Sequence, residues 1–421
     1  MAIVIKTDTN LFSPVYNKME VAIFQNGLTI SSPDYRYIFD IKIVLPNGTT
    51  ETIRTKVSPD PSQQFGVQDL SGHIEKYVKE EIVPNNDTKS FRRTDNGIVK
   101  YYVEYGEEYR LTINDPIVEY PNQLTGSNKY AFGGSFEWHR WVDFTNNTEY
   151  LNYLFDTNNQ GGFLTNYKTP KVTINDLGWH WFLTENPTQV DYMEVNTYNS
   201  LGGLISTFQI DKTITGSDDQ DRLQSIPTAP QSLNNVTDPF ILGSQPVITS
   251  VVSSYTIQCF ESGGTNVGEM LTFTIQQQCF YEIYRIHFEN EYGAFDSFNF
   301  TKNSKRSSEG ERKSFTTNKP NLDSNGINYY HSEEKKVDYY GKFSNKINLV
   351  SDFLTETENN WLKEMVFSNK AYLEFETSQG VRDFKPCKTL STSWGEKKTA
   401  IDKLFILEVE IELIDNFRQR R

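Results

Sequence analysis

Residues 280–300 constrain the fold of this chain more than any other stretch. Apolar Tyr284, Ile286 and Phe288 alternate with polar residues, which is the period-two pattern of a half-buried strand. The pattern breaks at 290–293, where a glycine can take the positive φ of a tight turn, and an aromatic alternation then resumes. We therefore expect a β-hairpin with one apolar side and one solvent-facing side. The solvent-facing side would carry Arg285, His287 and Glu289.

The rest of the sequence predicts a mostly β protein. Aromatic residues make up 14% of the 421 residues, and tyrosine and phenylalanine favour strands. Further strand pairs flank Asn47-Gly48, Gly106 and Gly202-Gly203, each read as a hairpin turn. We expect tandem antiparallel β-sandwich domains of the immunoglobulin or fibronectin kind, followed by a C-terminal α+β part.

Shifts in composition divide the chain into four expected domains, because 421 residues exceed one ordinary core. An N-terminal β-sandwich with a short helix at Leu70, Ile74 and Val78 would be followed by a middle β domain, a second sandwich that carries a long polar arm, and the α+β part. Their expected bounds are 1–130, 131–245, 246–345 with the arm at 302–336, and 346–421.

Two elements of the last domain have clear local signals. Thr355 followed by Glu358 is a capping box, and the apolar residues that follow it have helical spacing. Near the C-terminus, apolar Leu407, Val409 and Ile411 alternate with glutamates, which indicates a strand with one buried side.

Charge and cysteine content narrow the class of protein. The formal net charge of −14 argues against nucleic-acid binding through a broad basic face. Three widely spaced cysteines form neither a disulfide framework nor a zinc motif, so we expect synthesis in a reducing compartment. We also expect no signal peptide, and no apolar run approaches the roughly 20 residues that span a membrane.

Tryptophans and histidines offer one candidate binding site. Trp138, Trp141, Trp179 and Trp181 could form a stacking platform for sugar rings, or simply the aromatic core of a sandwich. His139 and His180 lie among them without acidic or cysteine partners at metal-binding spacing. We expect both histidines to be packed between aromatic rings.

Paired carboxylates are frequent in an acidic chain and identify no catalytic residue here. Glu107-Glu108 and the pair Glu289 and Glu291 resemble a glycosidase pair only in composition, since the required separation is three-dimensional. The glycine clusters at 133–134 and 263–264 lack the lysine of a phosphate loop. We expect no catalytic residue, no metal and no cofactor.

Basic residues gather in two otherwise polar segments that we expect to contact neighbouring subunits. A polar arm of this length inside a compact protein usually has a function, so we expect it to become ordered against an acidic neighbour; an exposed β-ribbon is the alternative. The candidate contact residues are Lys305, Arg306, Arg312, Lys313, Arg418, Arg420 and Arg421.

Several segments resemble structural proteins of the crAss-like phages and related tailed phages of Bacteroidota. The resemblance covers most of the chain and is carried by packing and turn residues. The segments are Asn10-Leu-Phe-Ser-Pro-Val-Tyr-Asn17, Phe163-Leu-Thr-Asn166, Tyr292-Gly-Ala-Phe-Asp296, the predicted helix at 356–367 and the strand at 402–413.

The resemblance implies a non-enzymatic virion protein in the tail or neck, built as a ring of copies between the portal and the tail. Its partners would be further copies and the portal, an adjacent ring or tail-hub proteins. DNA would pass through the lumen without stable binding. The alternative function is a host glycan-binding, receptor-binding tail protein that uses the tryptophan platform.

Overall fold

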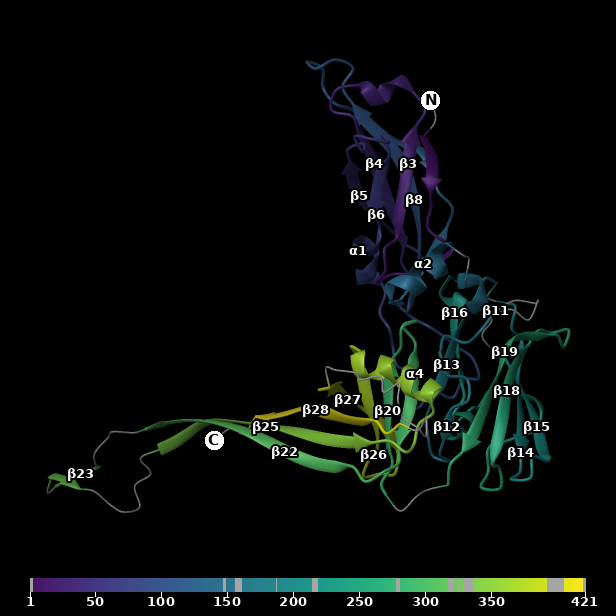
Figure 1. Cartoon of the computed structure of the whole chain (residues 1–421), viewed down its shortest axis with the longest axis vertical. Helices are drawn as coiled ribbons and strands as arrows, with labels where there is room; N and C mark the ends of the chain where they lie inside the picture. Colours follow the sequence, from purple (N-terminus) through teal and green to yellow (C-terminus); the bar gives the residue numbers. More distant parts are fainter. Residues whose placement is uncertain are drawn as a thin grey trace. The chain divides into compact units, whose positions relative to one another are not determined.

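The computed structural model describes most of the chain and confirms that it is mostly β, with 48% of residues in strands and 11% in helices. The described residues are 3–146, 149–155, 161–186, 188–213, 219–277, 281–316, 321–324, 326–328, 336–391 and 405–418. They form two compact units (Figure 1). Unit 1 holds Met1–Gln277 with Glu289–Phe298, and unit 2 holds Gln278–Phe288 with Asn299–Arg421.

The N-terminal part of unit 1 consists of two sheets that share one core. One sheet has the strand order β1-β3-β6, and the other has the order β2-β10-β8-β4-β5 with β9 paired to β8. Val21, Phe39 and Val103, one from each of three strands, are buried together. The strands are β1 (Ile3–Thr7), β2 (Phe12–Pro14), β3 (Glu20–Gln25), β4 (Arg36–Val44), β5 (Thr50–Val57), β6 (Gly66–Asp69), β8 (Ile98–Tyr109), β9 (Val118–Thr125) and β10 (Lys129–Phe132).

The predicted short helix of this part is confirmed as α1 (Ser71–Ile74) and the 3-10 turn η2 (Glu75–Tyr77), with Ile74 buried in the shared core. The predicted hairpin at Gly106 is wrong. Gly106 lies inside β8, at a register shift against β9, where a Cβ atom would stand 2.5 Å from the carbonyl oxygen of Tyr120. Glycine suits a turn because it can take a positive φ, and it suits this bulge because the two backbones approach closely, so the residue alone does not distinguish the two.

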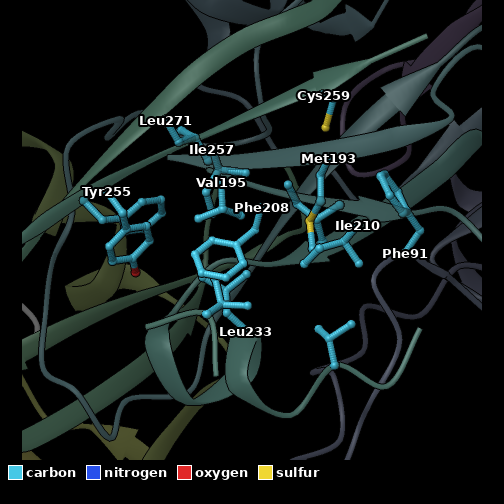
Figure 2. Close-up of a cluster of buried hydrophobic side chains, with 14 of the residues drawn as sticks. Phe91, Met193, Val195, Phe208, Ile210, Leu233, Tyr255, Ile257, Cys259 and Leu271 are labelled. Atoms are coloured by element: carbon cyan, nitrogen blue, oxygen red, sulfur yellow. The ribbon is translucent and has the colours of Figure 1, made fainter. Parts of the chain in front are cut away.

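The C-terminal part of unit 1 packs two further sheets around a second core. Its sheets have the orders β11-β13-β16-β7 and β12-β19-β18-β14-β15-β17. Figure 2 shows Leu233, from helix α3 (Pro230–Asn234), beside the ring of Phe208. The strands are β7 (Arg92–Arg93), β11 (Leu154–Phe155), β12 (Lys171–Val172), β13 (Trp179–Thr184), β14 (Tyr192–Tyr198), β15 (Leu204–Asp211), β16 (Leu223–Pro227), β17 (Phe240–Leu242), β18 (Ser254–Phe260) and β19 (Asn266–Ile275).

The expected domain boundary at residue 245 does not divide this part. β18 lies beyond that residue and pairs with β14 from Tyr192↔Phe260 to Tyr198↔Ser254. Both strands also contribute to the same core. The remaining helical elements of unit 1 are η1 (Leu28–Ser31), α2 (Trp138–Asn146), η3 (Glu149–Tyr153) and η4 (Asp219–Arg222).

Unit 2 is organised by a seven-stranded sheet with the order β21-β20-β26-β27-β28-β25-β22. Helix α4 (Glu356–Phe367) begins at the predicted capping box, where Thr355 Oγ1 accepts from the Glu358 backbone N–H. Trp361 of this helix packs against Phe288, with ring centroids 5.5 Å apart. The strands are β20 (Tyr284–Glu289), β21 (Phe295–Phe300), β22 (Lys305–Thr316), β25 (Lys336–Val350), β26 (Ala371–Glu376), β27 (Arg382–Thr389) and β28 (Glu408–Arg418); β23 (Asn321–Asp323) pairs with β24 (Gly326–Asn328).

The predicted solvent-facing side of the hairpin β20–β21 is wrong. Arg285 and His287 are both buried, and the His287 ring packs edge-on against Phe384 of β27, with ring centroids 4.9 Å apart. His287 Nε2 lies 2.9 Å from Glu374 Oε2, and Arg285 Nε lies 3.4 Å from the same oxygen. Burial, assisted by Arg285, lowers the pKa of His287 well below its ordinary value, so the ring is neutral at pH 7.

The polar arm is a β-ribbon over its described residues. β22 pairs with β25 from Lys305↔Asn348 to Thr316↔Lys336. Antiparallel backbone pairing needs no apolar side chains, which is why the polar sequence gave no strand signal. In Figure 1 the ribbon continues past the ends of β20, β26 and β27. The expected boundary at residue 345 falls inside β25.

Candidate functional site

The four predicted basic contact residues of the arm all lie on β22, the edge strand of the unit 2 sheet. Lys305 and Lys313 share one side of the strand, and Arg306 and Arg312 share the other, since side chains alternate along a strand. All four are exposed. Arg418 ends β28 and pairs in register with Lys342, whereas Arg420 and Arg421 lie outside the described residues.

Arg306 and Arg312 have partners within unit 2. Arg306 donates to the Tyr284 hydroxyl and to Glu282, at 2.7 Å in both cases. Arg312 lies 3.8 Å from Asp338 across the ribbon. These ion pairs are solvent-exposed, so each contributes little to stability. The positive charge of the ribbon therefore stays accessible to another molecule.

The four tryptophans do not form one platform. Trp138 and Trp141 lie on α2 with ring centroids 5.0 Å apart, and Trp138 is 62% exposed. Trp179 and Trp181 lie on β13 and are each 6% exposed. Every residue of β13 is buried, because both faces of that strand are covered. A sugar-stacking role therefore requires exposure that Trp179 and Trp181 lack.

The candidate glycosidase carboxylates are engaged in structural contacts. The Tyr35 hydroxyl and Gln25 Nε2 donate to Glu107 Oε2 at 2.8 and 2.9 Å. Lys56 Nζ donates to Glu108 Oε2 at 2.6 Å. As consecutive strand residues, Glu107 and Glu108 point to opposite faces of the sheet and cannot flank one bond.

The histidines of the tryptophan-rich segments also lack metal partners. His180 is buried, with Nδ1 2.8 Å from Thr228 Oγ1 and its ring packed edge-on against Phe163. His139 is exposed on α2. In the part of the chain that the structure describes, no three His, Cys, Asp or Glu side chains are grouped so as to hold a metal ion.

The tip of the β20–β21 hairpin is fixed within unit 1. Gly293 has φ +72°, and a Cβ atom there would stand 1.9 Å from the carbonyl oxygen of Gly133. Asn290 Nδ2 donates to the Leu164 carbonyl at 2.8 Å, and the Ser135 N–H donates to the Glu291 carbonyl at 2.7 Å. The turn that the sequence indicated is therefore also a packing site that admits only glycine.

Arg140 of α2 joins this tip to the neighbouring segments. It pairs with the Glu291 carboxylate, which also accepts from Asn166, and its Nη2 donates to the Tyr292 and Tyr153 hydroxyls at 2.6 and 3.1 Å. Burial lowers the pKa of the Arg140 guanidinium, but Tyr292 and Tyr153 raise this pKa by more than burial lowers it. The net shift of the Arg140 pKa is therefore upward. Burial raises the pKa of Tyr292. Both groups keep their ordinary charge states at pH 7.

A pocket of about 380 Å³ opens beside this network in unit 1. Its size is in the range of small-molecule sites. Sequence reasoning missed this pocket, because its walls come from separate segments; the Gly161-Gly162 pair is the one local signal that could have indicated close backbone packing there. The lining residues are Asn152, Tyr153, Gly161, Gly162, Phe163, Thr165, Asn166, Lys168, Glu269 and Tyr292.

No protein-family model matches the chain, and no curated protein matches it. Across the described residues, no helix is both long enough and apolar enough to cross a membrane. The ribbon and the pocket are the two features of the described residues that bear on function.

Proposed function

We propose that the chain is a non-enzymatic structural subunit that assembles with copies of itself into a ring, in the tail or neck of a tailed phage particle. The observation that carries this proposal is the exposed ribbon formed by β22 and β25. It is a long protruding element with no enzymatic geometry of its own, and an arm of this kind suits contacts between subunits.

The outer half of the ribbon exposes apolar side chains to solvent. Beyond Gly341, the described residues of β22 and β25 pair only with each other. Phe315 and Tyr339 contact each other there, with ring centroids 6.1 Å apart, and are 50% and 63% exposed. A two-stranded ribbon is marginally stable alone, so a covering surface would stabilise it by removing these rings from water.

The charge of the ribbon favours a second copy of the chain as the molecule that covers these rings. β22 and β25 together contain seven basic residues (Lys and Arg) and three acidic residues (Asp and Glu), so their net charge is +4. The rest of the chain has 34 basic and 52 acidic residues, so its net charge is −18. The remainder of another copy is therefore electrostatically complementary to the ribbon. Like-charged edge residues such as Lys305 and Arg306 also discourage indiscriminate strand pairing.

A contact between the ribbon of one copy and a different surface of the next is heterologous, and such contacts form a ring when the rotation between copies closes and an open filament when it does not. The resemblance to crAss-like phage structural proteins supports a place between the portal and the tail, with the portal, an adjacent ring or tail-hub proteins as neighbours. An acidic lumen would let DNA pass, because it does not retain phosphates.

Charge reversal on the ribbon tests the assembly role. We expect Arg312→Glu with Lys313→Glu to abolish higher oligomers of the purified chain in mass photometry and rings in negative-stain electron microscopy. The far-UV circular dichroism spectrum should not change, because both side chains are exposed.

The matched control reverses two exposed lysines of unit 1, Lys18→Glu with Lys89→Glu, and should leave assembly intact. A parent chain that stays monomeric at high concentration and is absent from particles would refute the proposal, and so would equal assembly of the two double variants.

A further inference from the structure

The pocket beside Arg140 is a second place where this molecule can bind a partner, independent of the assembly role. Its side walls combine three kinds of group. The partly exposed Tyr153 ring supplies aromatic surface, and Asn152 and Asn166 supply amides. The remaining wall holds the ion pair between Lys168 Nζ and Glu269 Oε2.

The charges of the lining argue for an uncharged ligand. Lys168 and Glu269 neutralise each other, so an anionic ligand would meet the carboxylate and a cationic ligand would meet the ammonium group. The Lys168 side chain is 55% exposed, whereas that of Glu269 is 19% exposed. The ammonium group is therefore the more accessible member of the pair, and the carboxylate beside it offsets its charge.

The same groups match a ligand that is rich in hydroxyls. A hydroxyl both donates and accepts, and so does an amide, while the carboxylate accepts and the ammonium group donates. The Tyr153 ring supplies the apolar surface on which a sugar ring can stack. We propose that this pocket binds a neutral saccharide. The sugar-binding role considered for the tryptophans is thereby assigned to a different set of residues.

The backbone holds the pocket in a fixed shape. The Gly162 N–H donates to the Asn152 carbonyl at 2.7 Å, and the Glu269 N–H donates to the Gly161 carbonyl at 3.0 Å. The Phe163 N–H donates to Glu269 Oε1 at 2.8 Å, which also orients the carboxylate. A Cβ atom at Gly161 would stand 2.0 Å from the Leu154 carbonyl oxygen. A preformed site of this kind loses less entropy on binding.

Saturation-transfer NMR tests the proposal with the full-length chain. The neutral probes are D-glucose, D-galactose and N-acetyl-D-glucosamine at millimolar concentration, and D-glucuronic acid is the anionic probe. We expect at least one neutral sugar to receive saturation and the uronic acid to receive markedly less. Lys168→Met and Glu269→Gln should each reduce the signal of the bound sugar at least fivefold.

Lys171→Met is the matched control, because Lys171 is an exposed lysine three residues from Lys168 that does not line the pocket. It should bind like the parent chain, and thermal unfolding of all variants checks that they are folded. The proposal is overturned if no neutral sugar binds, if binding survives both pocket substitutions, or if the uronic acid binds best.

Discussion

At the scale of single residues, the close contact at Gly293 makes a sharp prediction. Gly293 and Gly48 have nearly the same φ, +72° and +79°, but a Cβ atom at Gly48 would have no atom within 4 Å. Gly48→Ala should therefore lower the free energy of unfolding by about 1 kcal/mol, from backbone conformation alone. Gly293→Ala should lower it by about 3 kcal/mol or more, because the Gly133 backbone must also move.

Urea unfolding followed by tryptophan fluorescence measures this difference, with each variant compared with the parent chain. Equal losses of stability in the two variants would mean that the hairpin tip is not packed against Gly133.

Lys212 predicts a dependence of stability on pH. Burial lowers its pKa to about 8, and Asp221 and Asp191 only partly offset this effect. An unfolded lysine has a pKa near 10.4. Between these pH values the unfolded chain binds a proton that the folded chain has released, so folding stability should rise with pH across that window.

Lys212→Met should remove this rise, which we expect to be on the order of 2 kcal/mol in urea unfolding at pH 7.5 and pH 10. The exposed Lys18→Met serves as control and should keep the parent pH dependence. Identical curves for the Lys212 variant and the parent would contradict the burial argument.

At the scale of elements, the start of α4 offers a direct test of a sequence signal. Thr355 and Glu358 satisfy each other's backbone N–H groups, since the Thr355 N–H donates to Glu358 Oε2 at 2.8 Å and the Glu358 N–H donates to Thr355 Oγ1 at 3.2 Å. Thr355→Ala should lower the free energy of unfolding by about 1 kcal/mol.

Glu356→Gln is the control within the same turn, because it removes a charge without breaking the cap. It should cost about 0.5 kcal/mol or less. Chemical denaturation followed by circular dichroism ranks the two variants, and the reverse order would be inconsistent with the capping box.

Elements with local signals could be predicted from the sequence, and those set by distant contacts could not. The capping box at Thr355 and the turns at Gly48 and Gly202 depend on residues a few positions apart. Gly106 was misread because a bulge and a turn need the same residue. The sequence of the ribbon shows no apolar alternation from which strands could be predicted, because backbone pairing holds its two strands together.

At the scale of the whole molecule, the same distinction between local signals and distant contacts explains why the domain boundaries and the pocket could not be predicted from the sequence. β14 and β18 are separated in sequence by all of β15, β16 and β17, and only their pairing joins residues on both sides of position 245. The pocket collects side chains from 152–168, from Glu269 and from Tyr292. No short motif encodes such a set, so sequence reasoning reached the class of fold but not the site.

The hairpin tip also has a consequence for the order of events during synthesis. Glu289–Phe298 belongs to unit 1, although residues on both sides of it belong to unit 2. A ribosome that has released only the first 277 residues has therefore not yet supplied Glu291, Tyr292 or Gly293, which complete the Arg140 network. The larger unit can reach its final form only after part of the smaller one has emerged, so the two are coupled in time during translation.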